Sequence, residues 1–156
     1  MNVSAKCSLS LSLLLLLTLL IGSAFVAPQG GPFVLGKADQ PLSKEVKLRL
    51  TRAYQAQYGE EARVRAIEVL KHKGKPFLAI QTGSQVSPSL AIQLKVRDGK
   101  WGFGANAATN TCSGDPCSKC SWSERMGCQC EASGKCNHST TQLTSLRGFA
   151  EVLGLY

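Results

Sequence analysis

The chain has 156 residues and a formal net charge of +8 at pH 7. This length suffices for one domain of ordinary size and excludes two. Most of the excess charge lies before residue 101, where lysines and arginines are interleaved with glutamates instead of forming a run. The pattern therefore argues against a specific nucleic-acid site and predicts at most weak electrostatic binding to anionic surfaces.

Residues 1–24 have the composition of a secretory signal peptide. The leucine-rich segment Leu9–Ile21 follows a short positive region and is followed by small residues up to Ala24. Such a signal predicts export of the chain to a secreted or periplasmic location. We predict cleavage after Ala24, which removes Cys7 from the mature chain. If the segment were retained, Leu9–Ala27 is about long enough to anchor the chain in a membrane.

The residues after the signal predict a tether and then a helix. Residues 25–40 combine prolines and glycines with no hydrophobic period, which is typical of a flexible leader. From Ser43 to Tyr58 the apolar residues recur at helical spacing. Ser43 is the expected N-cap, and Gly59 supplies the stop.

Beyond Gly59 the hydrophobic period changes from helical to strand-like. Val64–Lys71 and Phe77–Thr82 are predicted strands, joined by a turn at Lys73, Gly74 and Lys75. The clearest alternation runs from Leu90 to Arg97. Asp98-Gly99 then indicates a hairpin, with Trp101–Phe103 beginning the returning strand.

Together these elements predict an α+β core over residues 41–107. One amphipathic helix packs on a three- to four-stranded antiparallel meander and covers its apolar face. This outline is similar to the cystatin-like arrangement. The Gln-x-Val-x-Gly loop of that inhibitor family is absent, because Gln85-Val86 has the wrong spacing and no following glycine. The resemblance therefore implies an architecture, and not inhibition of cysteine proteases.

The region 108–138 carries the chemistry of the chain. Its six cysteines, an even number, predict three disulfides in an exported protein, but sequence leaves fifteen possible pairings open. No apolar period runs through the region, so we expect a loop-rich segment that orders itself only when cross-linked. The candidate disulfide residues are Cys112, Cys117, Cys120, Cys128, Cys130 and Cys136.

Three alternatives use the same cysteines. Zinc could be held by Cys117, Cys120, Cys136 and His138, which are suitable tetrahedral ligands. The spacing from Cys112 through Cys117 to Cys120 resembles the first three ligands of plant-type two-iron ferredoxins, which implies an iron–sulfur site. A redox-active Cys117–Cys120 pair is the third alternative. The disulfide interpretation requires no cofactor.

The remaining sequence gives little support for catalysis. His72 and His138 are the two histidines, and no recognised nucleophile, metalloprotease or phosphate-loop string occurs. Residues 139–156 predict a short C-terminal helix that packs on the core. We therefore expect a small exported protein, not an enzyme, that acts as a binding or structural module for an unknown partner. The alternative is a thiol-redox or metal-binding protein.

Mass spectrometry of the purified exported protein tests these expectations. We expect a chain that begins at Phe25, is lighter by about six hydrogens, and resists alkylation until it is reduced. A mass that retains residues 1–24 would contradict cleavage, and a thiol alkylated without reductant would support the redox alternative. Zinc or iron in the native spectrum would overturn the disulfide interpretation.

Overall fold

The computed structural model describes residues 31–156 except 84–86, 115–116, 118, 126 and 132. The predicted signal peptide, residues 1–24, and the loop containing Gln85-Val86 lie outside the described residues. No helix in the described part of the chain is both long and apolar enough to cross a membrane.

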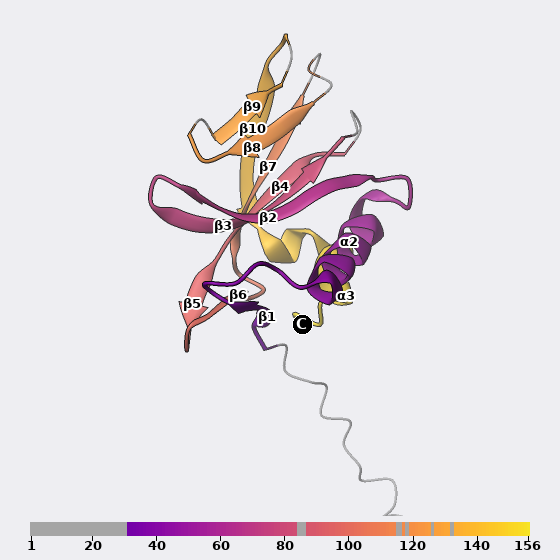
Figure 1. The fold of residues 1–156 in the computed structure, drawn as a ribbon. Coiled ribbons are helices and arrows are strands. Elements are labelled where there is room, and N and C mark those ends of the chain that lie inside the picture. Colours follow the sequence, from indigo (N-terminus) through magenta and orange to yellow (C-terminus); the bar gives the residue numbers. More distant parts are fainter. Residues whose placement is uncertain (1–30, 84–86, 115–116, 118, 126, 132) are drawn as a thin grey trace, which may run out of the picture.

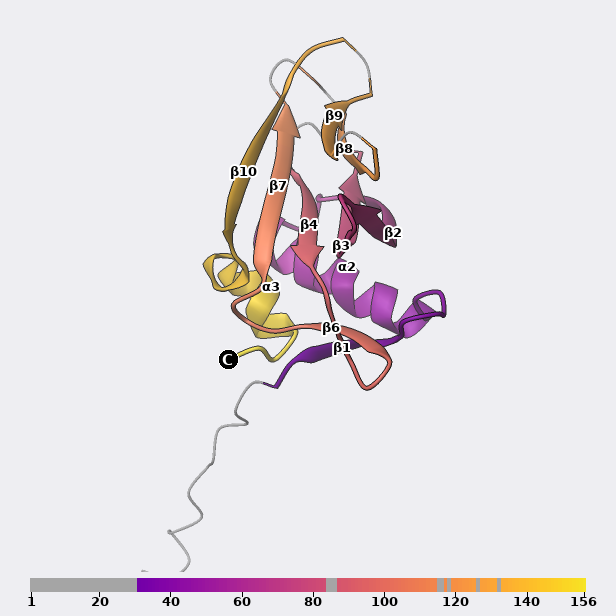
Figure 2. The ribbon, with the colours of Figure 1, turned by 90° about the vertical axis from the view of Figure 1, so that its left-hand side faces the viewer.

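A five-stranded antiparallel sheet forms the centre of the described structure (Figures 1 and 2). Its strands are, in spatial order, β10 (Cys136–Gln142), β7 (Ala108–Gly114), β4 (Ser89–Gln93), β3 (Lys75–Thr82) and β2 (Val64–His72). In β3, Leu78 and Ile80 face one side and Phe77 and Ala79 the other, and all four are buried. The sheet is therefore covered on both faces.

The first face is covered by helix α2 (Lys44–Tyr58), which has the ends that the sequence predicts. The Ser43 hydroxyl accepts a hydrogen bond from the Val46 backbone N–H at 3.2 Å, which caps the first turn. Gly59 ends the helix with φ 96°, a conformation that residues with a side chain rarely adopt. Leu50 and Tyr54 are fully buried against the sheet.

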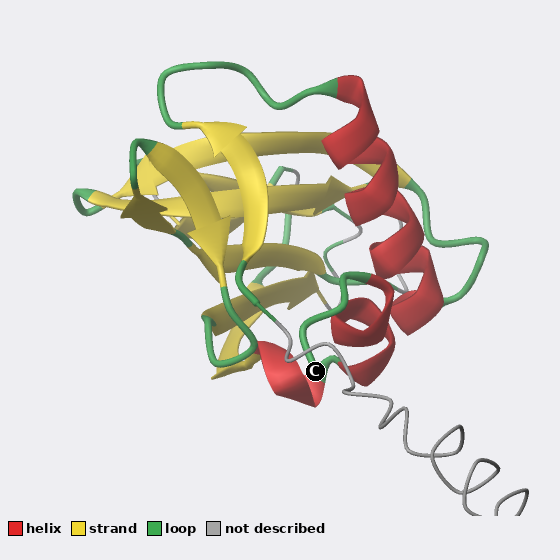
Figure 3. Ribbon diagram, turned by 90° about the horizontal axis from the view of Figure 1, so that it is seen from below, coloured by secondary structure: helices red, strands yellow, loops and turns green. Residues whose placement is uncertain are grey.

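A second helix, α3 (Arg147–Val152), follows the 3₁₀ turn η1 (Leu143–Ser145) and packs beside α2 (Figure 3). Phe149 of α3 is fully buried in the same apolar cluster as Leu50 and Ile80. The described structure thus contains two helices on one face of an antiparallel sheet, which confirms the α+β class.

Two hairpins have the tight turns that the sequence predicts. Lys73 and Gly74 have φ values of 50° and 76°, and Asp98 and Gly99 have φ values of 50° and 68°. Two successive positive φ angles define a type I′ turn, whose twist matches that of the flanking strands. These turns join β2 to β3 and β5 (Lys95–Arg97) to β6 (Lys100–Phe103).

Part of the predicted flexible leader, residues 25–40, is instead a strand. β1 (Phe33–Lys37) pairs with β6, and β6 pairs with β5, to make a separate three-stranded sheet. Phe33 lies opposite Phe103 in this pairing, and both are buried. The leader prediction was wrong here because the partner strand is distant in sequence and leaves no local pattern.

The sheet structure is also more extensive than the predicted three to four strands. The described residues form ten strands in three sheets, because β1 is added and because the cysteine-rich region contains β8 (Cys120–Ser123), β9 (Gly127–Cys130), all of β7 and part of β10. β10 extends to Gln142, so helix α3 occupies only part of the predicted 139–156 helical segment. The cysteine-rich region was expected to be loop-rich because it has no apolar period, but its strands are held by pairing with neighbouring strands, which an apolar period does not reveal.

The contact between the two helices yields a stability prediction. A Cβ added at Gly148 would lie 2.6 Å from the Ala56 carbonyl oxygen, whereas one at Gly83 would meet nothing within 4 Å. We expect Gly148→Ala to lower the free energy of unfolding by about 1–3 kcal/mol through overpacking. Urea unfolding of Gly148→Ala and of the control Gly83→Ala measures this. Equal stability of the two variants would contradict close packing of α2 and α3.

Candidate functional site

The six cysteines of the region 108–138 form three disulfides, the number that the sequence predicts. They join Cys112 to Cys128, Cys117 to Cys130 and Cys120 to Cys136, with Cα–Cα distances of 5.5, 6.0 and 5.9 Å. These distances lie within the usual range for the bond. The disulfides hold the β8–β9 hairpin against the second face of the five-stranded sheet (Figure 2). Several disulfides in a small protein are typical of an oxidising extracellular or periplasmic environment.

Trp122 of β8 is the apolar centre of this hairpin. It is 7% exposed and packs with Phe77, Ala91 and Cys112 in a cluster separate from the helix-covered core. Its indole N–H donates a hydrogen bond to the Ser89 carbonyl oxygen at 3.2 Å. Trp122 therefore anchors the hairpin to the sheet, and Met126, the other large apolar side chain of the cysteine-rich region, lies outside the described residues.

The hairpin also satisfies buried polar groups of the sheet. The Gln81 side chain donates to the Trp122 carbonyl oxygen at 2.8 Å and accepts from the Trp122 backbone N–H at 2.9 Å. The Ser89 hydroxyl donates to the Cys120 carbonyl oxygen at 2.7 Å. Gln81 and Ser89 are buried, so without these partners each would carry a desolvation cost.

The four residues predicted as alternative zinc ligands do not form one site, because the cysteines among them belong to two different disulfides. Cys120 and Cys136 are bonded to each other, and Cys117 is bonded to Cys130. His138 Nε2 instead forms a hydrogen bond with Asn110 Oδ1 at 3.0 Å. Some of the cysteine sulfurs lie within 4.8 Å of one another, as adjacent disulfides require, and a disulfide sulfur is not the thiolate that zinc or an iron–sulfur cluster binds.

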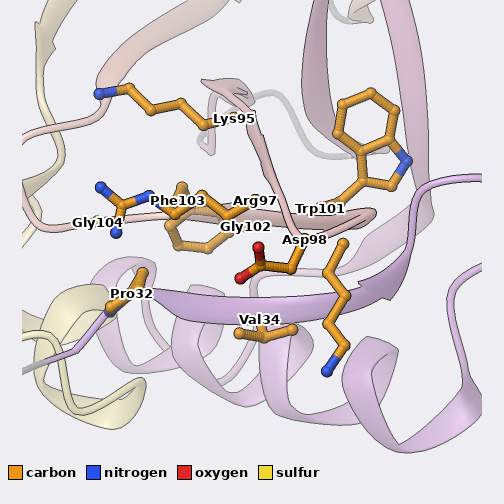
Figure 4. Close-up of a pocket in the computed structure, with 10 residues that line it drawn as sticks. Pro32, Val34, Lys95, Arg97, Asp98, Trp101, Gly102, Phe103 and Gly104 are labelled. Carbon is orange, nitrogen blue, oxygen red and sulfur yellow. The ribbon is translucent and has the colours of Figure 1, made fainter.

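A hollow with a volume of about 520 Å³ lies on the outward face of the three-stranded sheet (Figure 4). Lys95, Arg97 and Lys100 line it together with one acidic side chain, Asp98. In Figure 4 the side chains of Lys95 and Arg97 extend from β5 toward the same side. We call this site the basic hollow.

The strand register explains why these cations gather. Arg97 lies opposite Lys100, and Lys100 lies opposite Lys37 on its other side. Residues opposite one another in a sheet point to the same face, so three cationic side chains form one row across three strands. Arg97 and Lys100 line the basic hollow, and Lys37 continues the row beyond its lining. Lys95 joins the same face because it is two residues from Arg97.

A glycine forms the floor of the basic hollow. Gly102 lies between Val34 and Lys95 in the register. A Cβ at Gly102 would lie 2.9 Å from the Phe33 carbonyl oxygen, so the close approach of β1 and β6 requires glycine there. Val34 beside it is 50% exposed and gives the hollow an apolar wall. The site therefore combines fixed positive charge with a small apolar surface.

The cations of the basic hollow are not paired with carboxylates. Among the described residues the one ion pair joins Arg65 to Glu131 at 2.8 Å, away from the hollow. The hydrogen bonds from the Arg65 guanidinium hold the pKa of Glu131 below its usual range. Asp98 lies more than 4.0 Å from every Lys and Arg nitrogen of the described structure, so the hollow keeps a net positive charge.

Two tyrosines of α2 are unsuitable for acid–base chemistry near neutral pH. Burial raises the pKa of Tyr54 well above its usual range, and its hydroxyl donates to the Pro88 carbonyl oxygen at 2.7 Å. Burial also raises the pKa of Tyr58 to about 12. Both side chains therefore stay protonated and serve packing.

Comparisons of the chain with protein families, with curated proteins and with solved structures gave no match. The function of the chain must therefore be inferred from its own residues. Sequence reasoning identified the cysteines but missed the basic hollow, whose cations are brought together by the register of three strands. The excess of lysine and arginine before residue 101 was the available signal.

Two of the disulfides close loops of the same length, which allows their local packing to be compared. The sequence separation is 16 for both Cys112–Cys128 and Cys120–Cys136. Each paired Cys→Ser variant should lose about 3 kcal/mol from loop closure. Both variants bury a hydroxyl in the apolar cluster, but Cys112 is 0% exposed and Cys120 is 6% exposed, so the Cys112→Ser/Cys128→Ser variant buries its hydroxyl more completely and should unfold at the lower temperature. Identical thermal unfolding of both paired variants would contradict this packing difference.

Proposed function

We propose that this protein is a small exported binding module that recognises an anionic ligand at the basic hollow. The main support is the registered row of Lys37, Lys100 and Arg97, with Lys95 beside it and no carboxylate partner within 4.0 Å in the described structure. Export is supported by the signal-like residues 1–24 and by three disulfides.

Repulsion between the neighbouring cations of the row lowers the stability of the folded three-stranded sheet. Like charges directly opposite one another in a sheet are unfavourable, at about 0.2–1 kcal/mol for each pair. Two such pairs share Lys100. A site that keeps an unfavourable charge arrangement without a compensating contact in the protein is a candidate for ligand binding. An anionic ligand would relieve the repulsion.

The ligand class that fits best is an acidic polymer such as a polysaccharide. Neighbouring strands are about 4.8 Å apart, so the row presents positive charge over roughly 10 Å, more than one carboxylate or sulfate would span. The hollow is exposed along its cationic side chains, which suits a ligand that continues past the site. Exposed charges of this kind give binding that weakens as salt is added.

The alternative functions based on the cysteines have less support. A thiol-redox centre needs an accessible sulfur, but Cys112, Cys117 and Cys120 are at most 6% exposed. The one pair expected for exchange, Cys117 with Cys120, is absent, since these two cysteines belong to different disulfides. A role in holding the hairpin accounts for the cross-links.

Binding to dextran sulfate, compared with uncharged dextran, tests the proposal. We expect the full chain to bind dextran sulfate at low ionic strength, and the Lys95→Gln/Arg97→Gln/Lys100→Gln variant to bind about tenfold more weakly. The control, Lys44→Gln/Lys47→Gln/Arg52→Gln, removes the same charge from exposed positions of α2. Calorimetric titration at two salt concentrations measures both.

Equal weakening by the two triple variants would show that binding follows net charge and not the basic hollow. Failure of the unmodified protein to bind dextran sulfate at low salt would overturn the polysaccharide class. Preferential binding to vesicles of phosphatidylglycerol would point to a membrane surface instead.

A further inference from the structure

A second cavity, of about 210 Å³, lies on the face of the five-stranded sheet that carries the β8–β9 hairpin. Phe77 and Ala91 form its floor, and Trp122 forms a wall. The Phe77 and Trp122 rings are edge to face, with centroids 6.1 Å apart. The cavity therefore has an apolar floor supplied by the sheet and an apolar wall supplied by the hairpin that the disulfides hold in place.

Asn110 supplies an oriented hydrogen-bond donor at this cavity. Its side-chain oxygen accepts from the Thr140 hydroxyl at 2.7 Å and lies 3.0 Å from His138 Nε2. Because the oxygen is turned toward β10, the amide nitrogen is left for the cavity. That nitrogen has no hydrogen-bond partner among the described residues.

His72 supplies an acceptor on the opposite side. Its Nδ1 lies 3.1 Å from the Glu124 carbonyl oxygen, which can only accept, so Nδ1 carries the proton. In the neutral ring Nε2 is then the acceptor. The ring is also in edge contact with Phe77, at 6.4 Å between centroids, which fixes its position beside the apolar floor.

The remaining polar groups of the lining favour a negative ligand. Lys75 and Gln93 complete the rim of the cavity, and the described lining contains no carboxylate side chain. Lys75 belongs to no ion pair in the described structure. A cationic group and an amide donor beside an apolar floor match a carboxylate attached to a ring.

The volume sets the size of the ring. A dry apolar cavity of about 150 Å³ is enough to hold benzene. The hollow of 210 Å³ has room for one six-membered ring that carries a carboxylate, and it opens to solvent on one side.

We propose that this cavity binds a six-membered ring that carries a carboxylate. The carboxylate accepts from Lys75 Nζ and the Asn110 amide, the ring covers Phe77 and Ala91, and His72 Nε2 accepts from a ring substituent. An aromatic acid and a uronic acid share this chemistry. The site is separate from the basic hollow and does not depend on the function proposed for it.

Titration of the ¹⁵N-labelled full chain, followed by the side-chain amide signals of Asn110 and Gln93, tests the proposal. The probes are benzoate and glucuronate, with benzyl alcohol and glucose as uncharged counterparts. We expect at least one acid to shift both amide signals, at concentrations up to about 10 mM, and to bind more tightly than its uncharged counterpart. Tighter binding of benzoate would identify the ligand as an aromatic acid, and tighter binding of glucuronate would identify it as a uronic acid.

Three variants locate the binding. Lys75→Gln should weaken it roughly tenfold, as expected for one charge-assisted contact. Lys71→Gln removes the same charge from the same hairpin on the opposite face and should leave it unchanged. Asn110→Asp keeps the acceptor for Thr140 but replaces the donor with a negative charge, and should abolish binding. Equal binding of the uncharged probes, no shift with either acid, or full binding by Asn110→Asp would overturn the proposal.

Discussion

The reciprocal hydrogen bonds between the Gln81 side chain and the Trp122 backbone join the cysteine-rich hairpin to the sheet. They allow the second sheet face to be buried although it contains polar residues. The three disulfides reduce the entropy cost of keeping the hairpin there, and Trp122 supplies the apolar area. The cavity that contains Asn110 and His72 exists only because this hairpin forms its wall.

Features set by neighbouring residues could be predicted from the sequence. Helix α2 begins at a serine cap and ends at Gly59 because both signals lie within a few residues of the helix. The turns at Lys73-Gly74 and Asp98-Gly99 depend on two residues each, and both were predicted. The even number of cysteines, taken with the signal-like start, favoured three disulfides, and the structure contains them.

Features set by distant residues could not be predicted. β1 forms because Phe33 pairs opposite Phe103, a contact with no local signature. The strand predicted from Leu90 to Arg97 divides at Leu94, whose backbone N–H donates to the Pro76 carbonyl oxygen at 3.1 Å, and continues into another sheet. The basic hollow and the orientation of Asn110 likewise depend on register across several strands. A single sequence contains the residues of such sites but not their juxtaposition.

For a chain that is exported, as proposed above, the connectivity of the disulfides constrains how it can fold. Each bond joins one of the first three cysteines of the region to one of the last three, in the order first to fourth, second to fifth and third to sixth. In a chain that crosses a membrane from its N-terminus, Cys112, Cys117 and Cys120 emerge before any native partner. Oxidation at that stage joins the wrong sulfurs, which thiol–disulfide exchange must then correct. The yield of native protein should therefore depend on a disulfide isomerase in the receiving compartment more than on the rate of oxidation.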